Sequence, residues 1–351
     1  MTSFLLCRFV PDAPMHLGEK EGVLEETFEY IRSDTLFSAI CNAYLLLYGR
    51  EELESLLEGF KLERPPFLIS SAFPYAADVL FFPLPKNIDL SSYIGVKKAK
   101  RVELVSESIF RAALKGDVED VIKKGYCLIQ GERVLVTREE AERLRDHLGV
   151  RVAEEIRIWR KREVPRVALD RKTNASSIYY FGEVKFSESC GLFFLMKEGN
   201  GFKGVEKRVK AALRLLRDEG IGGDRTYGKG MFEDVRFDGI SFECGRKDFF
   251  VTLSLYYPKR EEISCLKDAF YDLVTRGGWI FSYSGVGMRR RSVRMLAEGS
   301  VVRFATTHEG GEDLLHGALV DVTPADFGWH RIYRYGYAFP IPLEVGGRER
   351  L

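Results

Sequence analysis

The apolar positions in the first half of the chain change between the two-residue period of strands and the longer period of helices. They predict a strand at residues 3–9 and strands at 67–71 and 79–82. A helix is expected between them, with Ser33 or Asp34 as N-cap, Gly49 as its end and an apolar face of Leu36, Ile40, Ala43 and Leu47. Further helices are predicted at 106–114 and, capped by Thr137, at 138–148. This order of elements is typical of a ferredoxin-like βαββαβ unit.

The second half of the chain shows a similar order without detectable sequence similarity to the first. We expect a strand at 191–196, an amphipathic helix at 205–218, strands at 232–237 and 249–256, a helix at 261–275, and strands at 279–283 and 292–296. The pattern therefore predicts an α+β fold of two ferredoxin-like (RRM-like) βαββαβ domains packed together, with inserted loops and small subdomains. The expected domains are residues 1–160 and 161–351.

Composition limits the kinds of ligand that the protein can attract. The 351 residues contain 53 Lys and Arg against 52 Asp and Glu, a net charge of +1, so any polyanion site must be local. The 6 cysteines form no C-x-x-C pair, which suits reduced thiols in the cytoplasm. No apolar run or leader pattern predicts a membrane segment, and no histidine spacing predicts a metal site. We expect a cytoplasmic protein without cofactor or metal.

Residues 220–230 (GIGGDRTYGKG) hold five glycines and two cations in eleven residues, directly after the predicted helix at 205–218. Glycines allow backbone amides to converge on an anion, and Arg225 and Lys229 add positive charge. The spacing fits neither a dinucleotide fingerprint nor a P-loop, because Arg225 and Gly230 stand where those motifs need a glycine and a hydroxyl. The loop is predicted to bind phosphate, although a helix end at Gly220 followed by a long connection has the same composition.

Two further basic segments are candidate nucleic-acid contacts. Residues 157–172 carry seven cations against two acids, and aromatic residues flank them (Trp159, Tyr179, Tyr180 and Phe181). Such a mixture suits single-stranded RNA, but an ordinary solvated connection has it too. In residues 288–294 (MRRRSVR), a strand would place Arg290, Ser292 and Arg294 on one face, as a clamp for a phosphate backbone. Arginines paired with neighbouring acids produce the same pattern.

Several separate motifs, in order along nearly the whole chain, resemble the RAMP superfamily of CRISPR proteins, and most of all the family of the fourth Csm subunit of type III-A effector complexes. They are residues 33–39 (SDTLFSA), 70–74 (SSAFP), 82–85 (FPLP), 165–171 (PRVALDR), the glycine-rich loop, 293–295 (VRM), 298–300 (EGS) and 335–339 (YGYAF). The resemblance implies two RRM-like folds and a non-catalytic subunit that holds the 5′ repeat-derived tag of the crRNA. The implied partners are the large Cas10-type polymerase/cyclase subunit and the third Csm protein, a backbone subunit.

The same resemblance assigns residues to the RNA. Gly222, Gly223, Arg225, Tyr227, Gly228, Lys229 and Gly230 are expected to lie against the tag, and the segment from Arg166 to Arg171 near the guide or the guide–target duplex. His16 is a further candidate for RNA contact. A metal-independent endoribonuclease of the same superfamily is the alternative, with His16 as general base and Arg225 or Lys229 stabilising the phosphorane. A protein-interaction module that needs no RNA is a third possibility. Asp34 is interpreted as a helix cap rather than as a metal ligand or a catalytic acid.

Overall fold

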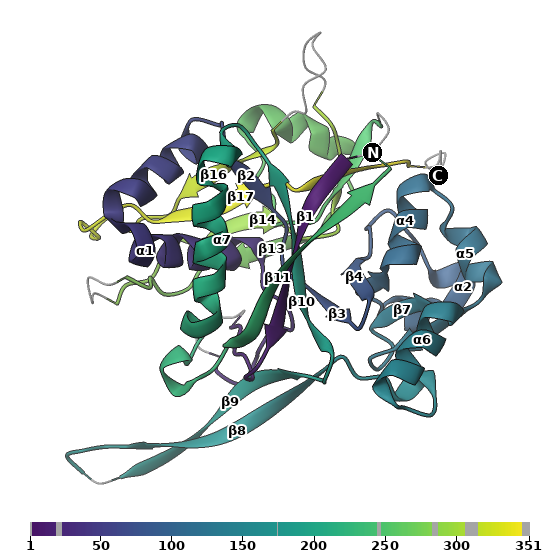
Figure 1. The fold of residues 1–351 in the computed structure, drawn as a ribbon, viewed down its shortest axis with the longest axis horizontal. Helices are drawn as coiled ribbons and strands as arrows, with labels where there is room; N and C mark the ends of the chain where they lie inside the picture. Colours follow the sequence, from purple (N-terminus) through teal and green to yellow (C-terminus); the bar gives the residue numbers. More distant parts are fainter. Residues whose placement is uncertain are drawn as a thin grey trace.

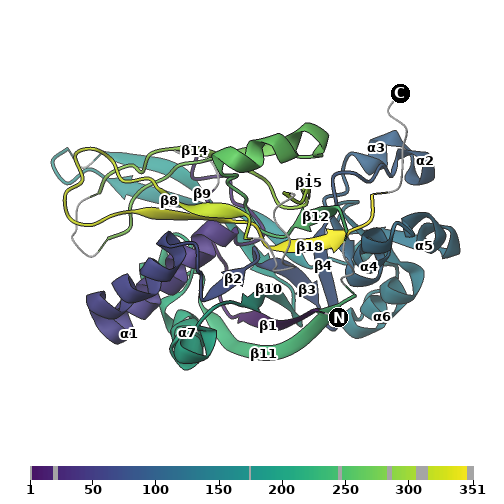
Figure 2. The same cartoon turned by 90° about the horizontal axis from the view of Figure 1, so that it is seen from above.

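The structure, a computed structural model, describes residues 2–18, 23–173, 175–243, 247–282, 287–305 and 315–345. It is an α+β fold around a mixed nine-stranded sheet with the order β11-β1-β10-β3-β4-β5-β7-β6, to which β2 adds by pairing with β10. Helices α1 and α7 lie at one end of the molecule and the helices of an inserted subdomain lie at the other end (Figures 1 and 2).

One half of the sheet is a ferredoxin-like unit. β1 (Thr2–Pro11) lies between β10 (Cys190–Glu198) and β11 (Phe232–Phe242), and β10 pairs with β2 (Phe67–Ile69) and β3 (Phe73–Ala76). α1 (Ser33–Lys61) and α7 (Phe202–Glu219) pack against each other. Gly49, at φ 81°, kinks α1 where we expected its end, and a second helical segment continues to Lys61.

This pairing corrects the expected repeat. The strand and helix that we assigned to the start of a second unit are β10 and α7, and with β11 they complete the unit that β1 begins. The expected boundary after residue 160 therefore does not divide the sheet, since strands from both ranges pair within it, and the two-domain division stays a prediction. The signal was lost because more than a hundred residues separate β3 from β10.

Part of that insertion is a small subdomain that extends the sheet, with β5 and β7 parallel. Thr137 caps its last helix as predicted: its side chain accepts from the Glu140 amide at 3.2 Å, and the Glu140 carboxylate accepts from the Thr137 amide at 3.0 Å. The elements are β4 (Val79–Pro83), α2 (Ser91–Ile94), α3 (Val96–Ala99), β5 (Leu104–Ser106), α4 (Glu107–Lys115), α5 (Val118–Lys124), β6 (Tyr126–Ile129), β7 (Val134–Thr137), α6 (Arg138–Leu148) and the 3₁₀ turn η1 (Ala153–Glu155).

The basic segment at 157–172 is not a loose connection. Most of it forms β8 (Trp159–Leu169), which pairs along its length with β9 (Ser176–Phe186). This two-stranded ribbon projects from the body of the molecule (Figure 1). The sequence pattern missed β8 because three consecutive cations (Arg160, Lys161 and Arg162) break the two-residue alternation, and the outer part of the strand is exposed on both faces.

The C-terminal part packs against α1 through short strands. The expected helix at 261–275 is wrong: a 3₁₀ helix, η3 (Arg260–Asp268), is followed by β13 (Leu273–Arg276). The expected strand at 279–283 is only a bridge between Trp279 and Arg289 within the described residues, and Tyr283 lies outside them. The remaining elements are the 3₁₀ turn η2 (Arg225–Tyr227), β12 (Phe249–Thr252), β14 (Val293–Leu296), β15 (Val301–Arg303), β16 (Gly317–Asp321), β17 (Tyr333–Tyr337) and β18 (Pro340–Leu343).

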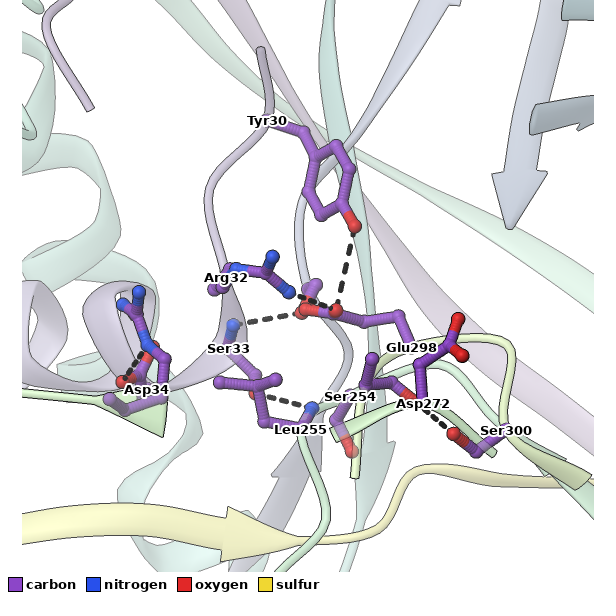
Figure 3. Close-up of polar contacts among 12 residues, drawn as sticks. Tyr30, Arg32, Ser33, Asp34, Ser254, Leu255, Asp272, Glu298 and Ser300 are labelled. Carbon is purple, nitrogen blue, oxygen red and sulfur yellow. Dashed lines mark hydrogen bonds and ion pairs between the residues drawn. The ribbon is translucent and has the colours of Figure 1, made fainter. Parts of the chain in front are cut away.

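Buried ion pairs join the start of α1 to this C-terminal part (Figure 3). The Asp34 carboxylate, 1% exposed, binds Arg276 at 3.0 Å and also Arg334. The Arg32 guanidinium binds Glu298 at 2.5 Å. Asp34 is therefore not the helix cap that we expected. Arg32 occupies the N-cap position without a side-chain cap bond, and the hydroxyl of Ser33 accepts from the amide of Leu255 at 3.0 Å.

Two further expectations of the sequence analysis concern membrane segments and the state of the cysteines. None of the helices in the described residues is long and apolar enough to cross a membrane. Five cysteines are free thiols in the structure, and Cys244 lies outside the described residues.

The ion pairs at Asp34 predict a large loss of stability when this carboxylate is removed. Asp34→Asn leaves two buried guanidinium groups without their counter-ion, which costs about 3–5 kcal/mol of unfolding free energy. Urea denaturation followed by circular dichroism measures it. The control is Glu54→Gln, which breaks the exposed pair with Arg50 on the same helix and should leave the free energy of unfolding almost unchanged, because solvent screens that pair. Equal effects in both variants would contradict the prediction.

Candidate nucleic-acid interface

The glycine-rich loop begins where α7 ends, and the N-terminal segment after β1 holds it in place. The amide of Gly220 closes the helix by donating to the carbonyl of Leu216 at 2.9 Å. The amide of Gly223 donates to the carbonyl of His16, and that of Gly230 to the carbonyl of Pro14, both at 2.9 Å. The loop is therefore a fixed structure rather than a slack connector.

Gly222 is a position in the loop where only glycine fits. Its φ is +105°, and a Cβ atom there would collide with the carbonyl oxygen of His16. The amides of Gly222 and Arg225 donate no hydrogen bond to any residue that the structure describes, and both residues line the cleft described next. Amides of this kind can bind an anion.

The loop forms one wall of a cleft of about 280 Å³. The N-terminal segment contributes His16, and the start of α1 contributes Thr35, Ser38 and Asn42. No aspartate or glutamate is among the described residues that line the cleft, whereas four arginines are: Arg32, Arg225, Arg276 and Arg290. Three parts of the chain far apart in sequence thus converge on one cationic cleft.

The four arginines divide into two pairs. Arg32 and Arg276 are neutralised by the buried carboxylates of Glu298 and Asp34. Arg225 stacks on the Phe281 ring at 4.4 Å, and the Arg290 Nε donates to the Trp279 carbonyl at 3.1 Å, and neither pairs with a carboxylate in the described part of the chain. Burial lowers the pKa of Arg290, and the charge of Arg276 lowers it further. An anion bound here would relieve that repulsion.

His16 lines the same cleft in a fixed orientation. Its ring is 8% exposed and lies against the Phe181 ring, with 4.2 Å between centroids. Nδ1 lies 2.7 Å from the carbonyl oxygen of Gly182. A carbonyl only accepts, so Nδ1 is the donor in this bond, and in the neutral ring Nε2 is then the acceptor. The arrangement suits an acceptor for an RNA hydroxyl.

Other predicted residues lie outside the cleft lining, where the loop meets the hairpin. Arg166 binds Asp224 at 2.5 Å and lies over the rings of Phe181 and Tyr227, at 4.5 and 5.1 Å. Tyr227, 74% exposed, and Gly228, which ends η2, are not among the residues that line the cleft. Gly230 only anchors the loop.

Lys229 is used by the protein itself. Its ammonium group binds the buried carboxylate of Glu183, which also accepts from Arg162. Burial opposes the ionisation of Glu183, but the hydrogen bonds from Lys229 and Arg162 outweigh it and hold its pKa below the ordinary value. Lys229 thus ties the glycine-rich loop to β8 and β9.

Two predicted residues are separate from the cleft. Arg171 is exposed in the turn of the hairpin, and Arg294 is exposed on β14. The predicted clamp face of Arg290, Ser292 and Arg294 is wrong, because β14 begins only at Val293 and Arg290 turns into the cleft. The sequence analysis missed Arg32 and Arg276, since single arginines outside a cluster give no signal.

The fold agrees with comparisons to known proteins. The RAMP superfamily model matches residues 12–233, and the model of the CRISPR Csm4 C-terminal domain matches residues 246–343. The matched ranges place the chain in the RAMP superfamily. A protein named CRISPR system Cms protein Csm4 from Thermococcus onnurineus (strain NA1) is 31% identical over 346 residues, 98% of each chain. The chain belongs to the Csm4 family, as the sequence motifs predicted.

Further relatives agree with this family. A protein of the same name from Methanocaldococcus jannaschii is 27% identical and covers 83% of each chain. Two solved structures share the fold. One is titled a Csm3-Csm4 subcomplex in the type III-A CRISPR-Cas interference complex, with a TM-score of 0.71, 21% identity and coverage of 98% of this chain and all of that chain. The other is a Csm1-Csm4 cassette in complex with AMPPNP, with a TM-score of 0.60, 20% identity and coverage of 99% and 100%.

The close packing at Gly222 predicts that alanine is tolerated less well at this position than at Gly228. Gly222→Ala should displace His16 and reduce RNA affinity and melting temperature together, because its Cβ has no room. The matched control is Gly228→Ala, at φ +75° with open space around the new Cβ, which costs only the roughly 1–2 kcal/mol of left-handed backbone strain. Thermal denaturation and RNA binding by fluorescence anisotropy compare the two. A Gly222→Ala variant as stable as the control would show that the loop is not held against His16.

Proposed function

We propose that this protein is a non-catalytic RNA-binding subunit of a type III-A CRISPR effector ribonucleoprotein, and that its cleft holds the 5′ repeat-derived tag of the crRNA. The observation that carries the proposal is the convergence of free loop amides with Arg225 and Arg290 in a cleft without acidic lining residues. Amides and guanidinium groups together bind phosphate oxygens. The membership of the Csm4 family supports the same function.

The cleft can also distinguish RNA from other polyanions. In the neutral ring of His16 the Nε2 atom can accept a hydrogen bond, and Thr35 and Ser38 line the same cleft. Such groups can contact 2′-hydroxyls and base edges. A tag of constant sequence needs only this kind of local recognition, which explains why the net charge of the protein stays near zero.

The hairpin is the second proposed RNA contact. One face of its outer part is apolar and exposed, with Val167 at 57%, Leu169 at 70%, Ile178 at 65% and Tyr180 at 47%. These side chains share a face because Val167 pairs with Ile178 and Pro165 with Tyr180. An apolar surface of this kind suits the faces of bases rather than phosphates. Arg171 in the turn supplies a charge beside it, consistent with a position near the guide or the guide–target duplex.

We further propose that the chain bridges the large Cas10-type subunit and the third Csm backbone subunit. Similar proteins have been solved as a Csm3-Csm4 subcomplex and as a Csm1-Csm4 cassette, which supports this arrangement. The proposed assembly places the cleft at the start of the guide RNA.

The alternative is that the protein cleaves CRISPR repeats with His16 as the base. The lone pair on Nε2 is compatible with that role, but catalysis also requires an acid for the leaving group. No carboxylate lines the cleft among the described residues, and the Lys229 ammonium is bound to Glu183. The arrangement therefore favours a bound, uncut strand.

The proposal predicts a defined salt dependence of RNA binding. About five phosphate contacts to a single strand give a log–log slope of affinity against salt near −3.5, and Arg225→Ala with Arg290→Ala should reduce it to about −2.1. Affinity at low salt should fall roughly tenfold or more, since charge-assisted hydrogen bonds contribute about 1.5–3 kcal/mol each. Fluorescence anisotropy with a repeat-derived single-stranded RNA measures both quantities.

Arg217→Ala is the control, because Arg217 is an exposed cation on α7 that pairs with Asp218 outside the cleft. It should leave both slope and affinity unchanged. The RNA should be recovered intact after incubation. A flat salt response would favour a protein-interaction module, and cleavage that a 2′-deoxy substitution and His16→Ala both abolish would instead establish the nuclease.

A further inference from the structure

A second and larger cleft, of about 1150 Å³, runs along α1. One wall is the outward face of this helix from Phe37 to Lys61. The other wall comes from residues 280–282, 290–291 and 323–333 of the C-terminal part. The function proposed above leaves this space unused.

The two clefts share part of their lining. Ser38, Asn42, Phe281 and Arg290 line both of them. Because Arg290 borders both spaces, it marks the route by which a strand held at the loop would reach the larger cleft.

The chemistry of the larger cleft suits unpaired nucleotides. Its acids, Glu54 and Glu58, are each bound to a cation of the same helix, Arg50 at 2.6 Å and Lys61 at 2.8 Å. Arg290 and Arg291 also line the space; Arg290 pairs with no carboxylate in the described part of the chain, and Arg291 interacts electrostatically with Asp321, which is not a lining residue. The net charge of the lining is thus positive, which favours a polyanion over an acidic or apolar peptide.

Trp329 offers the stacking surface. Its side chain lines the cleft and is 62% exposed, far more than the buried Trp159 at 2%. An exposed aromatic ring in a cleft whose lining carries a net positive charge is the combination that binds single strands through bases and backbone. His330 stands next to it, with Nε2 2.8 Å from the hydroxyl of Ser282.

We propose that the RNA strand held at the glycine-rich loop continues past Arg290 into the larger cleft, where at least one of its unpaired bases stacks on Trp329. This inference rests on the proposed function, because it extends the same strand. If this inference holds, Trp329 makes the protein bind longer strands more tightly than short ones, and it does so by stacking on a base rather than by binding phosphate.

The test compares two single-stranded RNAs, one of about ten nucleotides that fills both clefts and one of about four that fills only the loop cleft. Trp329→Ala in the full-length protein should weaken binding of the long RNA roughly fivefold or more, which is the effect of losing one base–aromatic stack. The affinity for the short RNA should not change. Trp329→Phe should restore most of the loss. Trp279→Ala is the control, because Trp279 is 60% exposed and lines neither cleft, while its carbonyl still holds Arg290.

The outcomes separate this inference from the proposed function. If Arg225→Ala weakens both RNAs and Trp329→Ala weakens neither, the strand does not enter the larger cleft and only the inference fails. If Trp329→Ala weakens both RNAs equally, the assigned path is also wrong. If Arg225→Ala affects neither RNA, the proposed function fails and this inference fails with it.

Discussion

The buried carboxylate of Asp34 is the contact on which the rest of the structure depends. It binds Arg276 and Arg334, which lie on the C-terminal strands β13 and β17, while its own backbone forms the first turn of α1. The neighbouring pair of Arg32 and Glu298 joins the same two parts of the chain. Because buried charges tolerate only well-oriented partners, these pairs fix the position of α1 relative to the C-terminal segments. Both clefts have walls from these two parts, so their shape follows from this junction.

The cations near the glycine-rich loop have different structural roles: some are paired with acids, and others line the cleft. Lys229 and Arg166 look like RNA ligands in the sequence, but they bind Glu183 and Asp224 and fasten the loop to the hairpin. Arg225 and Arg290 have no such acid in the part of the chain that the structure describes, although one lies in a glycine-rich motif and the other in a basic run. A local positive site thus exists in a chain whose net charge is only +1.

The sequence predicted local features well and non-local ones poorly. The helix start near Ser33, the Thr137 cap, the helix before the glycine-rich loop and the family itself were confirmed, because each depends on neighbouring residues. The pairing of β1 with β10 and β11 was missed, since it joins segments separated by a long insertion. Asp34 was interpreted as a cap because the two arginines that bind it lie more than two hundred residues away. The cleft was half predicted, with His16, the loop and Arg290 in the right place and Arg32 and Arg276 unforeseen.

The most direct test of the central claim is hydrogen–deuterium exchange at single-amide resolution, with and without a repeat-derived RNA. The amides of Gly222 and Arg225, which line the cleft, donate no bond within the described structure, so they should exchange fast in the free protein and slow down when phosphate oxygens accept from them. Amides of Gly223 and Gly230, already bonded to the N-terminal segment, should change little. Bound RNA with no protection at the amides of Gly222 and Arg225 would contradict the account.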